Sequence, residues 1–564
     1  MTNDPQQIAL QIERALRAAA RAGNRLLASG TAQVLVEHPA KREALTVALA
    51  RMGVRSAVTG SAADFVFVDE RANEYTELAS EASESPVANA LPAVIVGLDG
   101  SLASPRADDP AARIAWAERG MPATQLLARE LAEAVAIASK DEDGARPRVA
   151  VSLVLEPKTA AFTRTLAEVG CDVAVFSAVS ETDPTIAREL AQDGRVAVFA
   201  PEHPVSADHA QAIDADHAAR ILDWAPDFLI DDGAHLIRLA HTERPASLAR
   251  LRGAAEETTS GVRPLREMDA ANELRIPVIS VNDARTKTGF DNLIGTGQSC
   301  VFAIADLLDA AQWRAPLDAA LQEDTGSLDK GCGYRGIAGT RWTVIGYGPV
   351  GVGTARFAAA LGAHITVVEQ DPVRALTALH DGFEARGMAE ALAEADVVVS
   401  ATGVWHTLEE AHFAAMRPGT AVAVAGGIDD ELALDSLRAS GWSETTVSGT
   451  PGVDEWRAPG AEGGPNVLAG GGGVNYTASE GNPIEVMDLS FATQLAALNR
   501  LIRAPHTPGV HELAAVDEGI VARAALGARG ASADPDPEQR RAGGAAQPWR
   551  VHRYRAQSAE GVTA

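Results

Sequence analysis

The stretch from Val344 to Asp371 constrains this chain more than any other. It reads VIGYGPVGVGTARFAAALGAHITVVEQD, which predicts an apolar strand, a glycine-rich turn, an alanine-rich helix and a second strand that ends at Glu369. The turn holds four glycines, Gly346, Gly348, Gly351 and Gly353. Glycines let a backbone turn tightly and approach a pyrophosphate, and the helix N-terminus supplies unpaired N–H donors. Strand, turn, helix, strand and acid in this order predict a dinucleotide site.

The acid at the end of the second strand selects between two dinucleotides. A carboxylate at Glu369 can accept hydrogen bonds from ribose hydroxyls but would repel a 2′-phosphate, which favours NAD over NADP. The alternative is a glycine-rich turn in a sheet that binds nothing, and the complete order of elements argues against it.

Composition limits the partners. The chain has 564 residues, 46% of them hydrophobic, and a formal net charge of −27. Its length suggests about three or four domains, and its charge argues against nucleic acid or an anionic membrane as a partner. Three scattered cysteines predict neither a disulfide framework nor a metal site. The polar N-terminus lacks a signal core and no apolar run approaches the ~18 residues that spanning needs, so we expect a cytoplasmic protein.

The pattern of elements predicts an α/β fold. Residues 1–104 alternate helices and short strands and form a small α/β extension, which we expect to be an oligomerisation or docking module, with weak ligand binding as the alternative. Further on, apolar strands separated by helices predict two doubly wound, Rossmann-like parallel sheets. We expect the substrate-binding domain to comprise 105–295 and 483–520, the NAD-binding domain 296–482, and a docking tail 521–564.

Ligands of parallel sheets bind at the carboxyl ends of the strands, so the polar residues that follow each strand matter most. In the first large sheet these are Glu156, Asp232 and the segment Val281–Ser299, VNDARTKTGFDNLIGTGQS. The chain contains only five lysines, and one of them, Lys287, lies in this segment. A desolvated lysine can lose its proton, which arginine cannot, so Lys287 is a candidate base. The alternative is a solvated loop with a helix cap.

At these residues the sequence resembles the S-adenosyl-L-homocysteine hydrolase (adenosylhomocysteinase) family. The resemblance covers roughly residues 105 to 564. Its motifs are the Glu118–Pro122 helix, IDDGAHLIRLAHT (Ile230–Thr242), RGAAEETTSGV (Arg252–Val262), VNDARTKTGFDNLIG (Val281–Gly295), the dinucleotide stretch and VDEGIVAR (Val516–Arg523). The family oxidises the ribose 3′-hydroxyl with tightly held NAD, which acidifies C4′, allows elimination at C5′ and addition of water, and returns the hydride.

The resemblance implies roles for individual residues. Lys287 and Asp291 would face the ribose hydroxyls, Glu257 would bind the ribose and Asp232 would assist proton transfer near C4′ and C5′. The residues implied in NAD binding are Thr258, Thr259, Ser260, Asn292 and Asn475, with Gly346, Gly348, Gly351 and Glu369 from the dinucleotide stretch. Arg550 and Tyr554 have the spacing of a C-terminal pair that reaches the NAD of a neighbouring subunit, which implies a dimer or tetramer; a structural aromatic tail is the alternative.

The departures from the family concern proton handling and base recognition. The family's His-Met-Thr-x-Glu-Thr run is here Val154-Leu155-Glu156-Pro157-Lys158-Thr159, so a histidine becomes Val154, and the threonine and glutamate that recognise adenine become Glu156 and Lys158. Two more family histidines are replaced by Gly427 and Asn482. Imidazoles suit proton transfer at neutral pH, so their loss should impair elimination and hydration more than hydride transfer. His235 is a candidate replacement, with a surface role as the alternative.

Three interpretations remain. The first, which we favour, is a diverged NAD-dependent enzyme that oxidises the 3′-hydroxyl of a different nucleoside in a biosynthetic pathway and activates C4′ for elimination or addition at C5′. The second is a true S-adenosylhomocysteine hydrolase with relocated acid–base groups. The third is a non-catalytic NAD-binding regulator, against which the retention of Lys287, Asp291, Glu257 and Asp232 argues, because a binding protein needs no base beside the nicotinamide.

Overall fold

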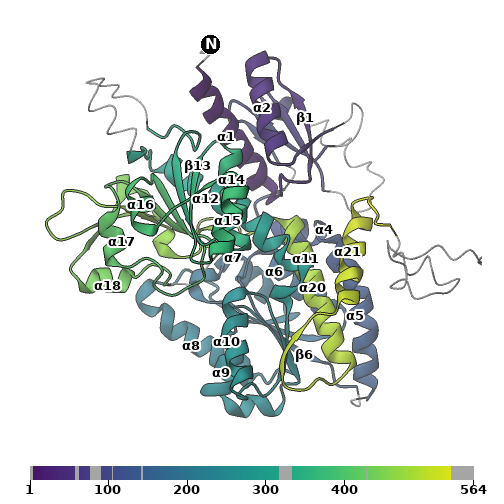
Figure 1. Ribbon diagram of the computed structural model, residues 1–564. Helices are drawn as coiled ribbons and strands as arrows, with labels where there is room; N and C mark the ends of the chain where they lie inside the picture. Colours follow the sequence, from purple (N-terminus) through teal and green to yellow (C-terminus); the bar gives the residue numbers. More distant parts are fainter. Residues whose placement is uncertain are drawn as a thin grey trace, which may run out of the picture.

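Three sheets organise the chain in a computed structural model (Figure 1), which describes residues 4–57, 63–75, 91–104, 106–141, 144–316, 333–426 and 430–534. The fold is α/β, as the sequence predicted, and each sheet has helices against it. The expected tail pair at 550 and 554, Cys332 and Gly427 lie outside the described residues.

The N-terminal module is a five-stranded sheet in the order β2-β1-β3-β4-β5, parallel except for β5. Its strands are β1 Thr31–Leu35, β2 Arg55–Ser56, β3 Phe65–Val68, β4 Val94–Gly97 and β5 Leu102–Ala103; its helices are α1 Pro5–Gly23, α2 Pro39–Arg51 and the 3₁₀ turn Ala72–Tyr75. One face of α1 joins the apolar core of this module, which also takes in Phe302 from the part of the chain that forms the third sheet. The charged face of α1 turns to that part, where Arg17 lies 2.7 Å from Asp309.

The second sheet is entirely parallel and has the order β20-β11-β10-β9-β6-β7-β8. Its strands are β6 Arg148–Ser152, β7 Asp172–Phe176, β8 Val196–Phe199, β9 Phe228–Asp231, β10 Gly253–Glu256, β11 Pro277–Ser280 and β20 Gly509–Glu512. Its helices are α4 Pro110–Arg119, α5 Pro122–Asp141, α6 Pro157–Glu168, α7 Pro184–Asp193, α8 Ala207–Asp223, α9 His235–Thr242, α10 Thr259–Ala270, α11 Arg285–Thr288, α20 Ile484–Arg503 and α21 Ala515–Ala528. Helix α21 packs against α5 and α20, so the position expected for the start of the tail, residue 521, lies within a helix of this part.

The third sheet has the order β14-β13-β12-β15-β16-β19-β18-β17. Its strands are β12 Arg341–Ile345, β13 His364–Val368, β14 Glu384–Ala385, β15 Val397–Ser400, β16 Ala421–Val424, β17 Ser443–Thr446, β18 Val453–Arg457 and β19 Asn466–Leu468. Its helices are α12 Thr296–Ala310, α14 Pro349–Ala360, α15 Pro372–His380, α16 Met388–Ala393, α17 Glu410–Ala415, α18 Leu434–Ala439 and α19 Val474–Thr477. The strand order reverses at β12, where the dinucleotide turn lies, as it does at the ligand crevice of doubly wound sheets.

One helical stretch of the described chain, Arg285–Ala310, is long and apolar enough by length and composition to cross a membrane. Of its most apolar window, 67% is buried inside the protein, and α12 packs against α14 and α19. This stretch is therefore a core helix, and it lies where the chain passes from the second sheet to the third.

Candidate active site

The carboxyl edge of the second sheet collects the acids that the sequence singled out. Strand β10 pairs in parallel with β9 so that Glu256 lies opposite Asp231. The next residues along the chain, Asp232 and Glu257, leave the sheet side by side, and the backbone N–H of Glu257 donates to the carbonyl of Asp231 at 2.9 Å. Strand register therefore brings together two acids that are 25 residues apart in the sequence.

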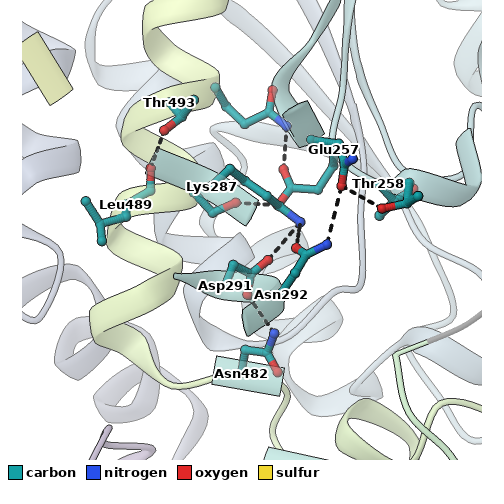
Figure 2. Close-up of polar contacts among 12 residues, drawn as sticks. Glu257, Thr258, Lys287, Asp291, Asn292, Asn482, Leu489 and Thr493 are labelled. Atoms are coloured by element: carbon teal, nitrogen blue, oxygen red, sulfur yellow. Dashed lines mark hydrogen bonds and ion pairs between the residues drawn. The ribbon is translucent and has the colours of Figure 1, made fainter. Parts of the chain in front are cut away.

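Lys287 is the centre of a buried polar cluster (Figure 2). Its Nζ lies 2.9 Å from Asp291 Oδ2 and 3.8 Å from Glu257 Oε1, and it donates to Asn292 Oδ1 at 2.8 Å. The lysine side chain is 4% exposed. Glu257 also accepts from Ser490 at 2.5 Å and from Gln494, both on α20. The cluster is thus one connected network of charge-assisted hydrogen bonds.

The charge state of this cluster differs from the expectation. Burial alone would lower the pKa of Lys287, but the neighbouring carboxylates of Asp291 and Glu257 outweigh it, and the pKa of Lys287 is raised. Burial raises the pKa of Glu257 more than Lys287 lowers it, and burial likewise raises the pKa of Asp232. In the resting site Lys287 is therefore an ammonium ion, and two nearby carboxyl groups take up protons more readily than usual.

A π-helical turn, Asp291–Gly295, positions the acid and the amide of the cluster. Such turns occur often at functional sites because they widen a helix locally. Asn482 stands where the family has a histidine, and it donates to Asp291 Oδ1 at 2.6 Å and to Thr296 at 2.9 Å. It accepts from Ser299 at 2.6 Å and from Asn475 at 3.1 Å. An amide with four partners can fix Asp291, but it cannot exchange protons at neutral pH.

The dinucleotide turn has the shape that a pyrophosphate requires. Gly346 has φ +90°, and a Cβ on Gly351 would lie 1.9 Å from the carbonyl oxygen of Gly346. A Cβ on Gly348 would instead point to open space, with Arg374 Nη1 at 3.8 Å as its nearest neighbour. A Cβ on Gly353 would lie 1.9 Å from the carbonyl of Leu293 in the π-helical turn. The glycines therefore leave room above the turn and bring α14 against the Lys287 cluster.

Two further groups fit the cofactor. Glu369 accepts from the backbone N–H of Tyr347 at 2.6 Å and of Asp371 at 2.9 Å, which fixes its carboxylate at the end of β13. Asn475 Oδ1 is buried and has no hydrogen-bond partner among the described residues. A buried orphan acceptor is costly unless a ligand donor satisfies it, and the carboxamide of a nicotinamide carries such donors.

One cavity of about 620 Å³ joins both halves of the site. Among its lining residues are most of those expected from the sequence: Asp232, Glu257, Thr258, Thr259, Ser260, Lys287, Asp291, Asn292, Gly346, Gly348, Glu369, Asn475 and Asn482. Gly351 lies behind the turn and shapes it without lining the cavity. His235 is exposed on the first turn of α9 and does not line the cavity, although its charge acts to lower the pKa of the neighbouring Asp232.

The residues that replace the family's adenine-recognising pair form a buried ion pair in the same cavity. Glu156 is the N-cap of α6, and its carboxylate accepts from the backbone N–H of Lys158 at 3.0 Å. Lys158 Nζ lies 2.6 Å from Glu156 Oε2 and donates to the carbonyl of Glu480 at 2.8 Å. Burial raises the pKa of Glu156 despite this ammonium group.

Sequence reasoning missed a group on the cofactor side. Glu431 is completely buried, and it accepts from Thr402 Oγ1 at 3.0 Å and from the N–H of Gly403 at 3.1 Å, both of which line the cavity. Thr402 and Gly403 follow β15, so the strand-end rule applied to VVVSATG could have found them. No local pattern marks Glu431, because it lies about thirty residues further along the chain.

Known proteins agree with these features. The family described as S-adenosyl-L-homocysteine hydrolase, NAD binding domain, matches residues 332–481. The chain is 34% identical to an adenosylhomocysteinase of Thermotoga maritima over 434 residues, which cover 76% of this chain and 97% of that protein. It is 36% identical to an S-inosyl-L-homocysteine hydrolase of Methanopyrus kandleri, over 70% of this chain and 86% of that protein. An adenosylhomocysteinase of Pyrococcus abyssi is 35% identical, over 76% of this chain and 93% of that protein.

Identity at this level over nearly the whole length of the relatives shows the family, and the family's NAD-binding domain coincides with the cradle built by β12, α14 and Glu369. The chain is a member of the adenosylhomocysteinase family and an NAD-binding enzyme of that type.

Proposed function

We propose that this protein oxidises the 3′-hydroxyl of a nucleoside other than the family's usual substrate, and that the oxidation activates C4′ for elimination or addition at C5′ in a biosynthetic pathway. The observation that carries the proposal is the cavity itself, because Lys287, Asp291 and Glu257 line the same space as Gly348 and Glu369. When bound, NAD accepts the hydride from C3′.

The residues of this chain would handle the protons of that step. The ammonium of Lys287 must first lose its proton to solvent, because Asp291 and Glu257 hold it in the charged form at rest. The neutral amine of Lys287 then takes the proton of the 3′-hydroxyl as the C3′–H bond breaks, so the O–H bond is exchanged for an N–H bond. Asp291, held by Asn482, would orient the hydroxyl.

Asp232 is the candidate for the later proton transfer at C4′. It lines the cavity on the strand next to Glu257, and burial raises its pKa. With Val154 and Asn482 in place of histidines, no imidazole lines the described cavity to assist the departure of a thiol. This shortage supports a product other than a freely hydrolysed thioether.

The activities for which the relatives are named favour a second candidate, cleavage of a homocysteine thioether of a nucleoside. In that case Asp232 and the Lys287 cluster would replace the missing histidines in the elimination.

A single assay separates the candidates. Purified protein is incubated with inosine, adenosine or S-adenosylhomocysteine, and absorbance at 340 nm is followed together with released homocysteine. Formation of reduced nicotinamide on addition of a nucleoside, abolished in Lys287→Ala, is the expected result. Rapid release of homocysteine would establish the second candidate. If no nucleoside changes the absorbance, in the wild type or in the variant, the protein binds NAD without carrying out this chemistry.

A further inference from the structure

The inference concerns the end of the cavity opposite the ribose-facing cluster, and it rests on the proposed function. The cluster begins at β11, whereas Lys158 and Glu156 follow β6, three strands away in the order β11-β10-β9-β6. Neighbouring strands are ~4.8 Å apart, so the two ends of the cavity are separated by about 14 Å of sheet edge. The loop Glu480–Asn482 joins them, since the carbonyl of Glu480 accepts from Lys158 while Asn482 donates to Asp291. A nucleoside held by its ribose at Lys287 would thus reach this end with its base.

Lys158 occupies a position that is unfavourable for a cation. It lies in the first turn of α6, where the helix dipole disfavours a cation, and it is 1% exposed. Burying an ion pair in a protein interior rarely adds stability compared with apolar residues of similar size. The pair nevertheless lines the cavity, beside the apolar side chains of Leu153, Met487 and Phe491. Apolar walls and one charged pair are the usual composition of a specificity pocket for a flat ring.

When the hydrogen bonds of Glu156 and Lys158 are counted, one polar group is left without a partner among the described residues, and that group is a donor. Glu156 Oε2 already accepts from the backbone N–H and from Nζ of Lys158, at 3.0 and 2.6 Å. Oε1 accepts from the backbone N–H of Thr159 at 3.3 Å and from its hydroxyl at 3.4 Å. The ammonium of Lys158 has three N–H groups, of which two are used by Glu156 and Glu480. The third has no partner among the described residues.

The ligand group that faces Lys158 must therefore be an acceptor. It must also be neutral, because Glu156 already compensates the lysine and a second carboxylate would add an unpaired buried charge. A carbonyl oxygen meets both conditions. The exocyclic amine of adenine does not, since it would place N–H donors against the free N–H donor of Lys158. We infer that Lys158 selects a nucleoside with an oxo-base, a 6-oxopurine such as hypoxanthine, and discriminates against adenine.

The position of the pair supports the same choice. Where the resemblance implies a glutamate, an acceptor, that recognises adenine, this chain has the donor Lys158, and where it implies a threonine, this chain has the acceptor Glu156. A 6-oxopurine differs from adenine by the same exchange, since it carries a carbonyl oxygen in place of the amine and an N–H in place of the neighbouring ring nitrogen. Oε1 of Glu156, whose two contacts are long, is the acceptor that can open to that N–H.

Binding of three nucleosides to the NAD-loaded protein tests the inference. Inosine, adenosine and purine riboside share the ribose and differ at the 6-position, which carries oxygen, an amine or hydrogen. We expect inosine to bind about 10- to 100-fold more tightly than either of the others, the range for a hydrogen bond to a buried charged donor. Equal or tighter binding of adenosine would overturn the inference, whatever the enzyme then does with the nucleoside.

Two variants keep the test independent of turnover. Lys158→Met should bring inosine down to the affinity of purine riboside and leave the affinity for purine riboside unchanged, and its thermal unfolding is measured to verify the fold. The double variant Glu156→Gln with Lys158→Met removes both charges and should behave in the same way even if the single variant unfolds. If inosine keeps its advantage in both, Lys158 is not the selecting group. Binding of inosine without reduction of NAD would refute the proposed function and leave this inference standing.

Discussion

Lys287 shows how two opposing effects of the interior set the chemistry of one residue. Desolvation disfavours the ammonium ion, but Asp291 at 2.9 Å and Glu257 at 3.8 Å favour it, and the pKa of the lysine is raised as a result. A base with a raised pKa is mostly protonated at neutral pH, so only a small fraction of the molecules carries the amine that the proposed oxidation needs.

The rate of nicotinamide reduction should therefore rise with pH. Each unit of pH below the pKa of Lys287 increases the amine fraction about tenfold, so the single-turnover rate at 340 nm should climb through the alkaline range towards a plateau. Lys287→Arg keeps the charge but cannot release its proton, and it should reduce the rate at least ~100-fold at every pH while NAD stays bound. A flat profile in the wild type would show that another group accepts the proton.

Substitutions at two glycines of the dinucleotide turn should distinguish an effect on folding from an effect on cofactor binding. Gly351→Ala would place a methyl group 1.9 Å from the carbonyl of Gly346, so the backbone must move, and we expect a loss of about 1–3 kcal/mol in unfolding free energy. Gly348→Ala meets only the open cavity and should change that free energy by less than ~0.5 kcal/mol while weakening NAD binding. Thermal unfolding with and without added NAD measures both effects. If Gly348→Ala binds NAD normally, the pyrophosphate does not lie over this turn.

At the scale of the elements, the contact between α5 and α20 depends on one acid, Asp488. Asp488 of α20 accepts from the backbone N–H groups of Ala123 and Thr124, at 3.1 and 2.7 Å, and so caps the N-terminus of α5 from a neighbouring helix. Burial raises the pKa of Asp488 to about 6, although these donors lower it. The same helix supplies Ser490 and Gln494 to Glu257, so the cap also fixes a wall of the site.

The pKa of Asp488 predicts a pH dependence of stability. The folded state binds the proton more tightly than the unfolded state, so the contribution of Asp488 to the free energy of unfolding falls as pH rises from about 4 to about 6 and is constant above that. Relative to Asp488→Asn, the wild type should lose up to about 3 kcal/mol across this window. Chemical denaturation of both proteins at several pH values measures the difference. A difference that does not vary with pH would mean that Asp488 stays ionised throughout.

At this scale, the sequence predictions came mainly from two sources: the periodicity of apolar residues and the polar residues that follow each predicted strand. Alternating strands and helices predicted the two large sheets, and Asp232 and Lys287 were found because they follow strands, whereas Glu257 was found only through the resemblance to the family. The polar strand β17, SETT, carries no apolar alternation and was missed. The bonds that define the site, Lys158 to Glu480 and Asn482 to Asp291, join residues 322 and 191 apart, and no local pattern encodes such distances. The raised pKa of Lys287 likewise depends on burial that only the fold creates.

On the scale of the whole molecule, the N-terminal module is tied to both halves of the enzyme. Arg17 contacts Asp306 and Asp309 of α12, and Arg25 contacts Glu485 at the start of α20. Asn24 donates to the carbonyl of Glu480 at 3.1 Å, the same oxygen that accepts from Lys158. The module therefore supports the loop that joins the two ends of the cavity.

Two arginines of α1 give a matched test of this attachment. Arg17 is 4% exposed, and its loss would leave the buried Glu13 without its ion-pair partner and remove one of the arginines that contact each aspartate, so Arg17→Ala should cost about 3–5 kcal/mol. Arg21 contacts Asp306 at 3.0 Å but is 65% exposed, and Arg21→Ala should cost no more than ~1 kcal/mol. Hydrogen exchange of residues 480–486 in both variants reports on the loop. Similar effects of the two substitutions would show that the module is not held through Arg17.

The charged docking face of α1 also has a consequence for synthesis on the ribosome. Arg17 and its partner Asp306 are 289 residues apart, and at about 5–20 residues per second the helix waits roughly 15 to 60 s before that partner is made. During this interval the apolar face of α1 can pack on its own sheet, in the core that contains Leu16 and Phe65. The face left exposed is the arginine-rich one, which water solvates well. A nascent chain built in this way exposes charge instead of apolar surface while it waits, and so has little tendency to aggregate.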